Sequence, residues 1–179
     1  MQIAYVVNSF GGGGAEFPIP AIVRQIETHE HKVKVYGLTP REGLLKDRLD
    51  SEGMAWACFD ESKKAHLKAL RWLKAQMLAD QPDIIWTSLN RSAIIGQRVG
   101  KALNIPVVTW QHNSRIDRIK YAILKHQKDI PKLWVADSDT IKELTIERFA
   151  LPHEAVHICL LYTSPSPRDL STSRMPSSA

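Results

Sequence analysis

Short apolar runs alternate with longer amphipathic segments along most of the chain. The apolar runs have the length of buried strands, and the segments between them repeat apolar positions at helical spacing. We predict seven strands, at residues 3–7, 32–36, 54–59, 83–86, 106–110, 133–136 and 155–158. We predict helices between them, near residues 18–28, 44–50, 65–79, 92–103, 117–127 and 140–149.

This alternation predicts the fold class. Parallel strands need crossover connections, and right-handed crossovers place helices on both faces of the sheet. We therefore expect an α/β fold built on a doubly wound parallel sheet of about seven strands. Ligands bind such sheets beyond the carboxyl ends of the strands, so the residues that directly follow each strand are the first candidates for a site.

The last segment has a different composition. From Tyr162 to Ala179, serines and prolines recur without apolar periodicity, and such a segment cannot bury enough surface to fold. Its sequence also resembles a tail that recurs at the end of unrelated translated sequence assemblies. Such a tail would arise if adapter DNA had been translated in frame with the gene. We expect one folded domain over residues 1–161 and a disordered, non-native segment over residues 162–179.

Composition and charge narrow the functional classes. Hydrophobic residues make up 44% of the 179 positions and charged residues 24%, as in a globular domain. No apolar run approaches the roughly 20 residues that cross a bilayer, and the opening residues lack signal-peptide features, so we expect a cytoplasmic protein. A net charge of +5 favours an anionic partner such as a nucleotide phosphate, a membrane surface or nucleic acid.

A glycine-rich loop follows the first predicted strand and leads into a helix that opens with Pro18 and Pro20. Glycines let the backbone approach a ligand, and a helix N-terminus offers amides and a positive dipole end. The loop fits neither the P-loop, which needs Lys-Ser or Lys-Thr, nor the dinucleotide fingerprint. The alternative is a flexible loop without a ligand. A phosphate or a sugar hydroxyl suits this glycine-rich loop, and the candidate binding residues are Gly12, Gly13, Gly14 and Glu16.

The residues after the fifth predicted strand supply the catalytic candidate, His112. An imidazole at this edge can donate to a sugar hydroxyl or, when protonated, offset charge that develops on a leaving phosphate. Asn113 beside it is a candidate for ligand binding. The alternative is that Asn113 or Ser114 caps the next helix and that His112 is incidental.

A polar edge also follows the fourth predicted strand. Asn90 is a further candidate for ligand binding, although Ser88 or Asn90 would serve equally well as a cap for a helix that begins near Ser92. We expect no metal site. The cysteines Cys58 and Cys159 lack metal-ligand spacing, and the histidine pair at positions 29 and 31 has no third ligand nearby.

Basic residues gather on two predicted helices. Lys64, Lys68 and Arg71 recur at helical spacing, with an apolar face formed by Leu67, Leu70, Leu73 and Met77. A second cluster comprises Arg115, Arg118, Lys120, Lys125 and Lys128. These clusters suit anionic lipid head groups, and the alternative is a plainly solvated helix face. Nucleic acid is not expected, because the basic residues are not interleaved with exposed aromatic residues.

Four segments, taken in order, resemble the N-terminal domain of the family 4 retaining glycosyltransferases, which have two facing Rossmann-like domains (the GT-B fold). They are residues 11–16, Leu49-x-x-x-Gly53-Met54, residues 83–88 and residues 106–113. The pattern Ser138-x-x-x-Lys142-Glu-Leu with Phe149-x-Leu-Pro152 looks like the last helix of that domain. The resemblance covers about residues 1–161.

The resemblance implies a hexosyltransferase that moves a sugar from a nucleotide-diphosphate donor to a glycan or lipid acceptor, with retention and without a metal cofactor. It implies that Gly13 and Gly14 lie against the donor phosphates or the acceptor, that Glu16 orders the loop and that His112 contacts the transferred sugar. The donor-binding domain is expected to begin near Leu160, so we expect this chain alone to fold without catalysing. One departure is Phe17-Pro-Ile-Pro20, which replaces the basic residues usual there.

Two other functions stay open from the sequence. A sugar-nucleotide epimerase uses two facing domains of the same kind. A non-catalytic module that binds an anionic lipid or a nucleotide would also use a glycine loop and basic helices.

Overall fold

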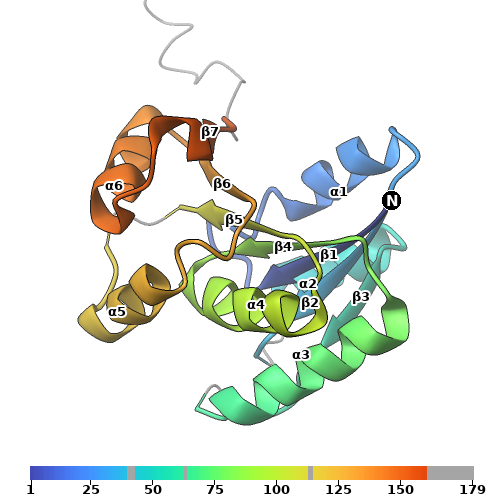
Figure 1. Cartoon of the computed structure of the whole chain (residues 1–179). Helices are drawn as coiled ribbons and strands as arrows, with labels where there is room; N and C mark the ends of the chain where they lie inside the picture. The colour runs from blue at the N-terminus through green and yellow to red at the C-terminus, as the bar shows by residue number, and fades with distance from the viewer. Residues whose placement is uncertain (40–42, 63, 113–114, 161–179) are drawn as a thin grey trace, which may run out of the picture.

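The computed structural model describes residues 1–39, 43–62, 64–112 and 115–160. These form one seven-stranded sheet in the order β3-β2-β1-β4-β5-β6-β7, with every strand pair parallel (Figure 1). The strands are β1 (Gln2–Val7), β2 (Lys32–Gly37), β3 (Ala55–Cys58), β4 (Ile84–Ser88), β5 (Val107–Gln111), β6 (Leu133–Ala136) and β7 (Val156–Ile158). The expected doubly wound parallel sheet of seven strands is therefore confirmed.

Six α-helices connect the strands: α1 (Ile19–Glu27), α2 (Leu44–Ser51), α3 (His66–Asp80), α4 (Asn90–Leu103), α5 (Arg118–His126) and α6 (Asp139–Phe149). A short 3-10 helix, His153–Ala155, precedes β7 and was not predicted. Asn113 and residues 162–179 lie outside the described residues, so the predictions made for them stay predictions.

The direction of the winding reverses between β1 and β4. From β1 the chain adds β2 and β3 on one side, and it then returns to add β4 to β7 on the other. Helices α1 and α2 pack on one face, and helices α3 to α6 cover the opposite face (Figure 1). The carboxyl ends of β1 and β4 therefore form the topological switch point, where sheets of this kind bind ligands.

Both faces of the central strand β1 are buried. Tyr5 and Val7 belong to the apolar cluster beneath α1 and α2, whereas Ala4 and Val6 belong to the cluster beneath α3 and α4. Parallel sheets are covered by helices on both faces, so a central strand such as β1 consists almost entirely of apolar residues. This rigid centre fixes the positions of the loops at the carboxyl edge.

The buried face of α3 differs from the predicted one. Ala69, Leu73 and Met77 are buried at four-residue spacing, but Leu67 is 69% exposed. At 100° per residue, Leu67 lies about 200° from Ala69 around the helix axis and therefore faces away from the sheet. The prediction that Leu67 belongs to the apolar face was wrong.

Among the described residues, no helix is both long enough and apolar enough to cross a membrane.

Candidate functional site

The loop after β1 is held by the side chain of Glu16. This carboxylate is buried, and it accepts hydrogen bonds from the Gly13 amide at 2.9 Å and from the Ser9 hydroxyl at 2.9 Å. Gly12 has a φ of +83°, a conformation that favours glycine. One carboxylate thus ties Ser9, which precedes the glycines, to Gly13 among them, in an arrangement that fits the ordering role expected of Glu16.

Most amides at the start of α1 are already used within the loop. The amides of Glu16 and Phe17 both donate to the Gly13 carbonyl at 2.8 Å, and Pro18 and Pro20 carry no amide hydrogen. The helix start therefore does not present the row of free donors that the sequence suggested. The open part of the loop is Gly14, which is exposed and has no atom within 4 Å of an added Cβ.

A strained turn joins β4 to α4. Leu89 has a φ of +79°, which is unfavourable for a residue with a branched side chain. The turn makes Asn90 the first residue of α4, two positions earlier than predicted. The amide of Ser92 donates to Asn8 Oδ1 at 2.9 Å, so the loop after β1 caps α4. The alternative that Ser88 or Asn90 caps this helix was wrong.

Two polar side chains at the start of α4 are buried without full hydrogen bonding. Asn90 is 8% exposed, and its Oδ1 atom has no partner among the described residues. Arg91 donates through Nη1 to the Leu38 carbonyl and to Thr39 Oγ1, while its Nε and Nη2 atoms have no partner there. Burial lowers the pKa of the Arg91 guanidinium. Sequence reasoning did not single out Arg91.

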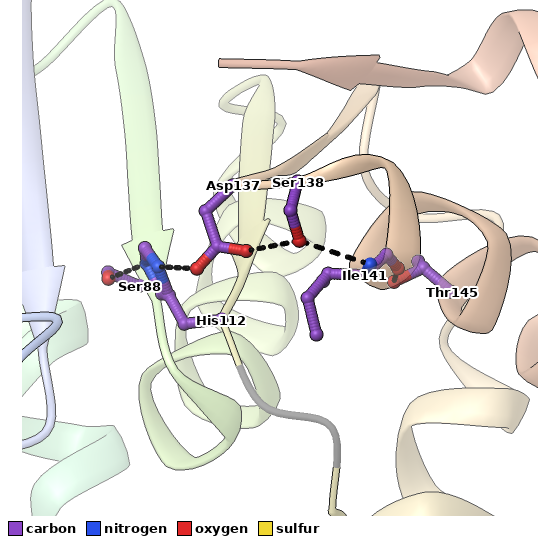
Figure 2. A network of polar contacts seen from close by, with 6 residues as sticks. All are labelled: Ser88, His112, Asp137, Ser138, Ile141 and Thr145. Carbon is purple, nitrogen blue, oxygen red and sulfur yellow. Dashed lines mark hydrogen bonds and ion pairs between the residues drawn. The ribbon is translucent and has the colours of Figure 1, made fainter. Parts of the chain in front are cut away.

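His112 lies at the centre of the carboxyl edge, directly after β5 (Figure 2). Its ring stacks on Trp110 with a centroid separation of 4.9 Å, and its side chain is 5% exposed. Nε2 lies 2.7 Å from the hydroxyl of Ser88 at the end of β4. Nδ1 lies 3.4 Å from Oδ2 of Asp137, which follows β6. Three neighbouring strands thus bring one polar residue each to the same place.

Asp137 is in turn fixed by the start of α6. The Ser138 hydroxyl lies 3.3 Å from Asp137 Oδ1 and accepts a hydrogen bond from the Ile141 amide at 3.3 Å as the cap of α6 (Figure 2). The Asp137 side chain is 23% exposed, so it is the most accessible member of the network formed by Ser88, His112 and Asp137.

Burial dominates the electrostatics of His112. Loss of solvation lowers the pKa of the imidazole, and the nearby Asp137 carboxylate opposes that shift without overcoming it. The ring is therefore neutral at pH 7 in the ligand-free chain. A neutral imidazole between a hydroxyl and a carboxylate can relay or hold a proton at the ligand edge of the sheet.

The order serine, histidine and carboxylate also occurs in hydrolases, where the serine attacks an acyl group. Ser88 is fully buried beneath the imidazole, so an acyl substrate cannot reach its hydroxyl oxygen. The geometry therefore does not favour nucleophilic catalysis by Ser88. Over the described ranges, no group of three or more His, Cys, Asp or Glu side chains is placed to hold a metal ion.

The structure thus brings Glu16 against Gly13 and brings His112 against Ser88 and Asp137. Sequence reasoning missed Asn8 and Asp137, although Asn8 directly follows β1 and Asp137 directly follows β6. A search of every residue after every strand would have included Asp137, because it comes immediately after β6.

The sequence profile of Glycosyltransferase Family 4 matches residues 12–159 of the chain. No curated protein sequence matches at a significant level.

Solved structures match the whole fold. Anabaena Alr3699/HepE in complex with UDP-glucose superimposes with a TM-score of 0.77 at 16% identity, over 96% of this chain and 48% of that protein. WaaB, a lipopolysaccharide outer core galactosyltransferase, superimposes with a TM-score of 0.76 at 16% identity, over 93% of this chain and 47% of WaaB. A UDP-N-acetylglucosamine 2-epimerase from Rickettsia bellii superimposes with a TM-score of 0.61 at 11% identity, over 88% of this chain and 44% of the epimerase.

At these identities the likeness establishes the fold, which is the Rossmann-like half of a GT-B protein. The chain spans about half the length of the structures that it matches, 48% in the case of HepE. The fold does not separate transferases from epimerases, but the sequence profile does. Because that profile matches most of the sequence, this chain belongs to Glycosyltransferase Family 4.

Proposed function

We propose that the chain is the acceptor-side domain of a hexosyltransferase that moves a sugar from a nucleotide-diphosphate donor to an acceptor hydroxyl with retention. Family membership is the observation that carries this proposal. HepE was solved with UDP-glucose, and WaaB is a lipopolysaccharide galactosyltransferase, so we extend the proposal to glycan or cell-envelope polysaccharide and lipid synthesis.

The proposal assigns residues 1–161 to this domain and places the donor-binding half in a longer protein. Gly12, Gly13, Gly14, Glu16, Asn90 and Asn113 would line the substrate or donor-phosphate side of the cleft between the halves. The chain alone would bind without turning over. No metal cofactor forms part of the proposal.

In this proposal His112 contacts the transferred sugar or the leaving phosphate. A neutral buried imidazole gains a proton more readily when a phosphate anion lies nearby, because an opposite charge favours the charged form. The resulting imidazolium would offset the charge that develops as the bond to the donor phosphate breaks. The Trp110 ring beneath it and the two polar partners beside it restrict its motion.

The test replaces His112 by alanine in a protein that contains both domains. We expect turnover to fall by at least about tenfold, since loss of a charge-stabilising contact costs a few kcal/mol. His126→Ala is the matched control, because His126 is an exposed histidine at the end of α5. Equal turnover in the His112→Ala variant and the wild type would remove His112 from the mechanism.

Two outcomes would favour the other functions. Epimerisation of a UDP-sugar in the absence of any acceptor would support an epimerase, and the chain also superimposes on an epimerase structure. Binding of nucleotide or anionic lipid by the two-domain protein without any turnover would support a non-catalytic module.

We also propose peripheral contact with the cytoplasmic face of an anionic membrane. The contact surface, called here the basic surface, comprises Lys64, Leu67, Lys68, Arg71, Arg118, Ile119 and Lys120. Its two apolar members are the reason for the proposal, since Leu67 is 69% and Ile119 is 74% exposed between basic neighbours. Burial lowers the pKa of His66, and Arg91 and Lys120 lower it further, so the starts of α3, α4 and α5 share one positive environment.

A further inference from the structure

Both ring nitrogens of His112 lie next to protein groups. Nε2 is 2.7 Å from the Ser88 hydroxyl oxygen, and Nδ1 is 3.4 Å from Asp137 Oδ2. Each nitrogen therefore faces a protein group in the ligand-free chain. The identity of the two partners decides which nitrogen carries the proton.

The two partners have different hydrogen-bonding capacity. An ionised carboxylate can only accept, whereas a serine hydroxyl can donate or accept. Nδ1 therefore needs its proton to interact favourably with Asp137. Nε2 then presents a lone pair, and the Ser88 hydroxyl can donate to it.

We propose that Asp137 is a positioning residue that holds neutral His112 as the tautomer protonated on Nδ1. The importance of this arrangement for sugar transfer rests on the proposed function, but the tautomer itself does not. Asp137 selects the proton position, and Ser88 occupies Nε2 from the neighbouring strand. Neither residue is assigned a direct contact with the substrate.

The arrangement lets His112 change charge without moving. When Nε2 gains a proton, the Ser88 hydroxyl can rotate and accept where it previously donated. The proton on Nδ1 stays next to the Asp137 carboxylate, whose Oδ2 is 3.4 Å away. The stacking on Trp110 at 4.9 Å keeps the ring plane fixed during this change. The network would therefore supply a positive charge at a defined point of the carboxyl edge.

The support around Asp137 makes this selection specific. The hydroxyl of Ser138, the cap of α6, lies 3.3 Å from the other carboxylate oxygen, Oδ1. Figure 2 shows the resulting chain of contacts from Ser88 through His112 and Asp137 to the first turn of α6. Asp137 is thus oriented by a helix terminus and not by a flexible loop alone.

The test is nitrogen NMR of the imidazole rings in this 179-residue chain labelled with ¹⁵N, recorded above the pKa of His112. We expect a protonated, pyrrole-like Nδ1 and an unprotonated, pyridine-like Nε2 for His112. In Asp137→Ala the ratio of the two tautomers should fall by at least about tenfold, because the variant lacks the negative charge 3.4 Å from Nδ1 that favours a proton there. In Ser88→Ala the Nδ1 proton should remain.

Asp139→Ala is the matched control, because it removes an exposed carboxylate two positions away at the start of α6. It should leave the His112 tautomer unchanged, and amide spectra establish that each variant is folded. A wild-type His112 protonated on Nε2 would overturn the proposal even if every variant failed to fold. A persistent Nδ1 proton in folded Asp137→Ala would also overturn it. This test measures the tautomer and not turnover. A failure of the proposed function would instead appear in the turnover of the two-domain protein.

Discussion

His112 illustrates how burial changes the chemistry of one residue. In the folded chain its pKa is lowered by burial, whereas in the unfolded chain it returns to about 6.5. Between the folded pKa and about 6.5, the unfolded state therefore binds more protons than the folded state. The free energy of unfolding should decrease as pH falls through this window, and His112 adds no further decrease below both values.

We predict that His112→Gln flattens this pH dependence. The glutamine cannot titrate, so the part of the slope that His112 contributes below about pH 6.5 should disappear. Chemical unfolding at several pH values between neutral and mildly acidic conditions measures it. His66→Gln should also flatten the slope, because burial lowers the pKa of His66 as well. His126→Gln is the exposed control, and a wild-type slope in His112→Gln would contradict the prediction.

The sequence indicated some of the candidate site residues but not the residues that contact them. His112 and Glu16 could be found because each follows a predicted strand within a polar or glycine-rich segment. The contact between His112 and Asp137 depends on β5 lying beside β6, and the cap from Asn8 to Ser92 depends on β1 lying beside β4. Strand order and register are properties of the assembled sheet, so these pairs could not be read from local spacing.

At the scale of elements, α4 is the helix that sets the polar edge, and glycines allow it to approach the sheet. A Cβ added at Gly96 would lie 2.3 Å from Thr87 Cγ2, and one at Gly100 would lie 2.2 Å from Val107 Cγ2. Both neighbouring side chains are β-branched and buried, so they cannot easily move aside. The close packing holds the start of α4 next to Ser88.

We predict that Gly96→Ala destabilises the chain by about 1–2 kcal/mol, even though alanine is favoured over glycine in a helix by roughly 1 kcal/mol. Thermal and chemical unfolding measure the change. Gly14→Ala is the control, because an added Cβ there has no atom within 4 Å, and its effect should stay within about 0.5 kcal/mol. Equal stability of the Gly96→Ala variant and the wild type would show that the helix can shift at little cost.

The element pattern was predictable because apolar periodicity reports burial directly. All seven strands and six helices occur where the alternation placed them, with small differences at their ends. The start of α4 was missed because the strained Leu89 carries no sequence signal comparable to glycine at a turn. Leu67 was misplaced because apolar character alone does not say which leucines of a helix face the sheet.

At the scale of the molecule, charge and exposed apolar groups share one edge. The chain carries a net charge of +5, and the basic surface lies at the helix starts that follow β3 and β5. This edge also carries His112 and the glycine loop. A membrane bound there would present a lipid acceptor to the proposed site, since both would lie on the same side of the sheet.

We predict that the chain binds vesicles containing anionic phospholipid and releases them as salt rises, because exposed charges are screened. Lys64→Glu with Arg71→Glu should weaken binding at least about tenfold, since each basic residue near the surface contributes about 1 kcal/mol. Lys101→Glu with Lys132→Glu changes the net charge equally at the opposite edge of the sheet, and should weaken binding far less. Vesicle co-sedimentation measures all three chains. Equal losses in the two double variants would mean that overall charge, and not the basic surface, determines binding, and the proposed membrane contact would then fail.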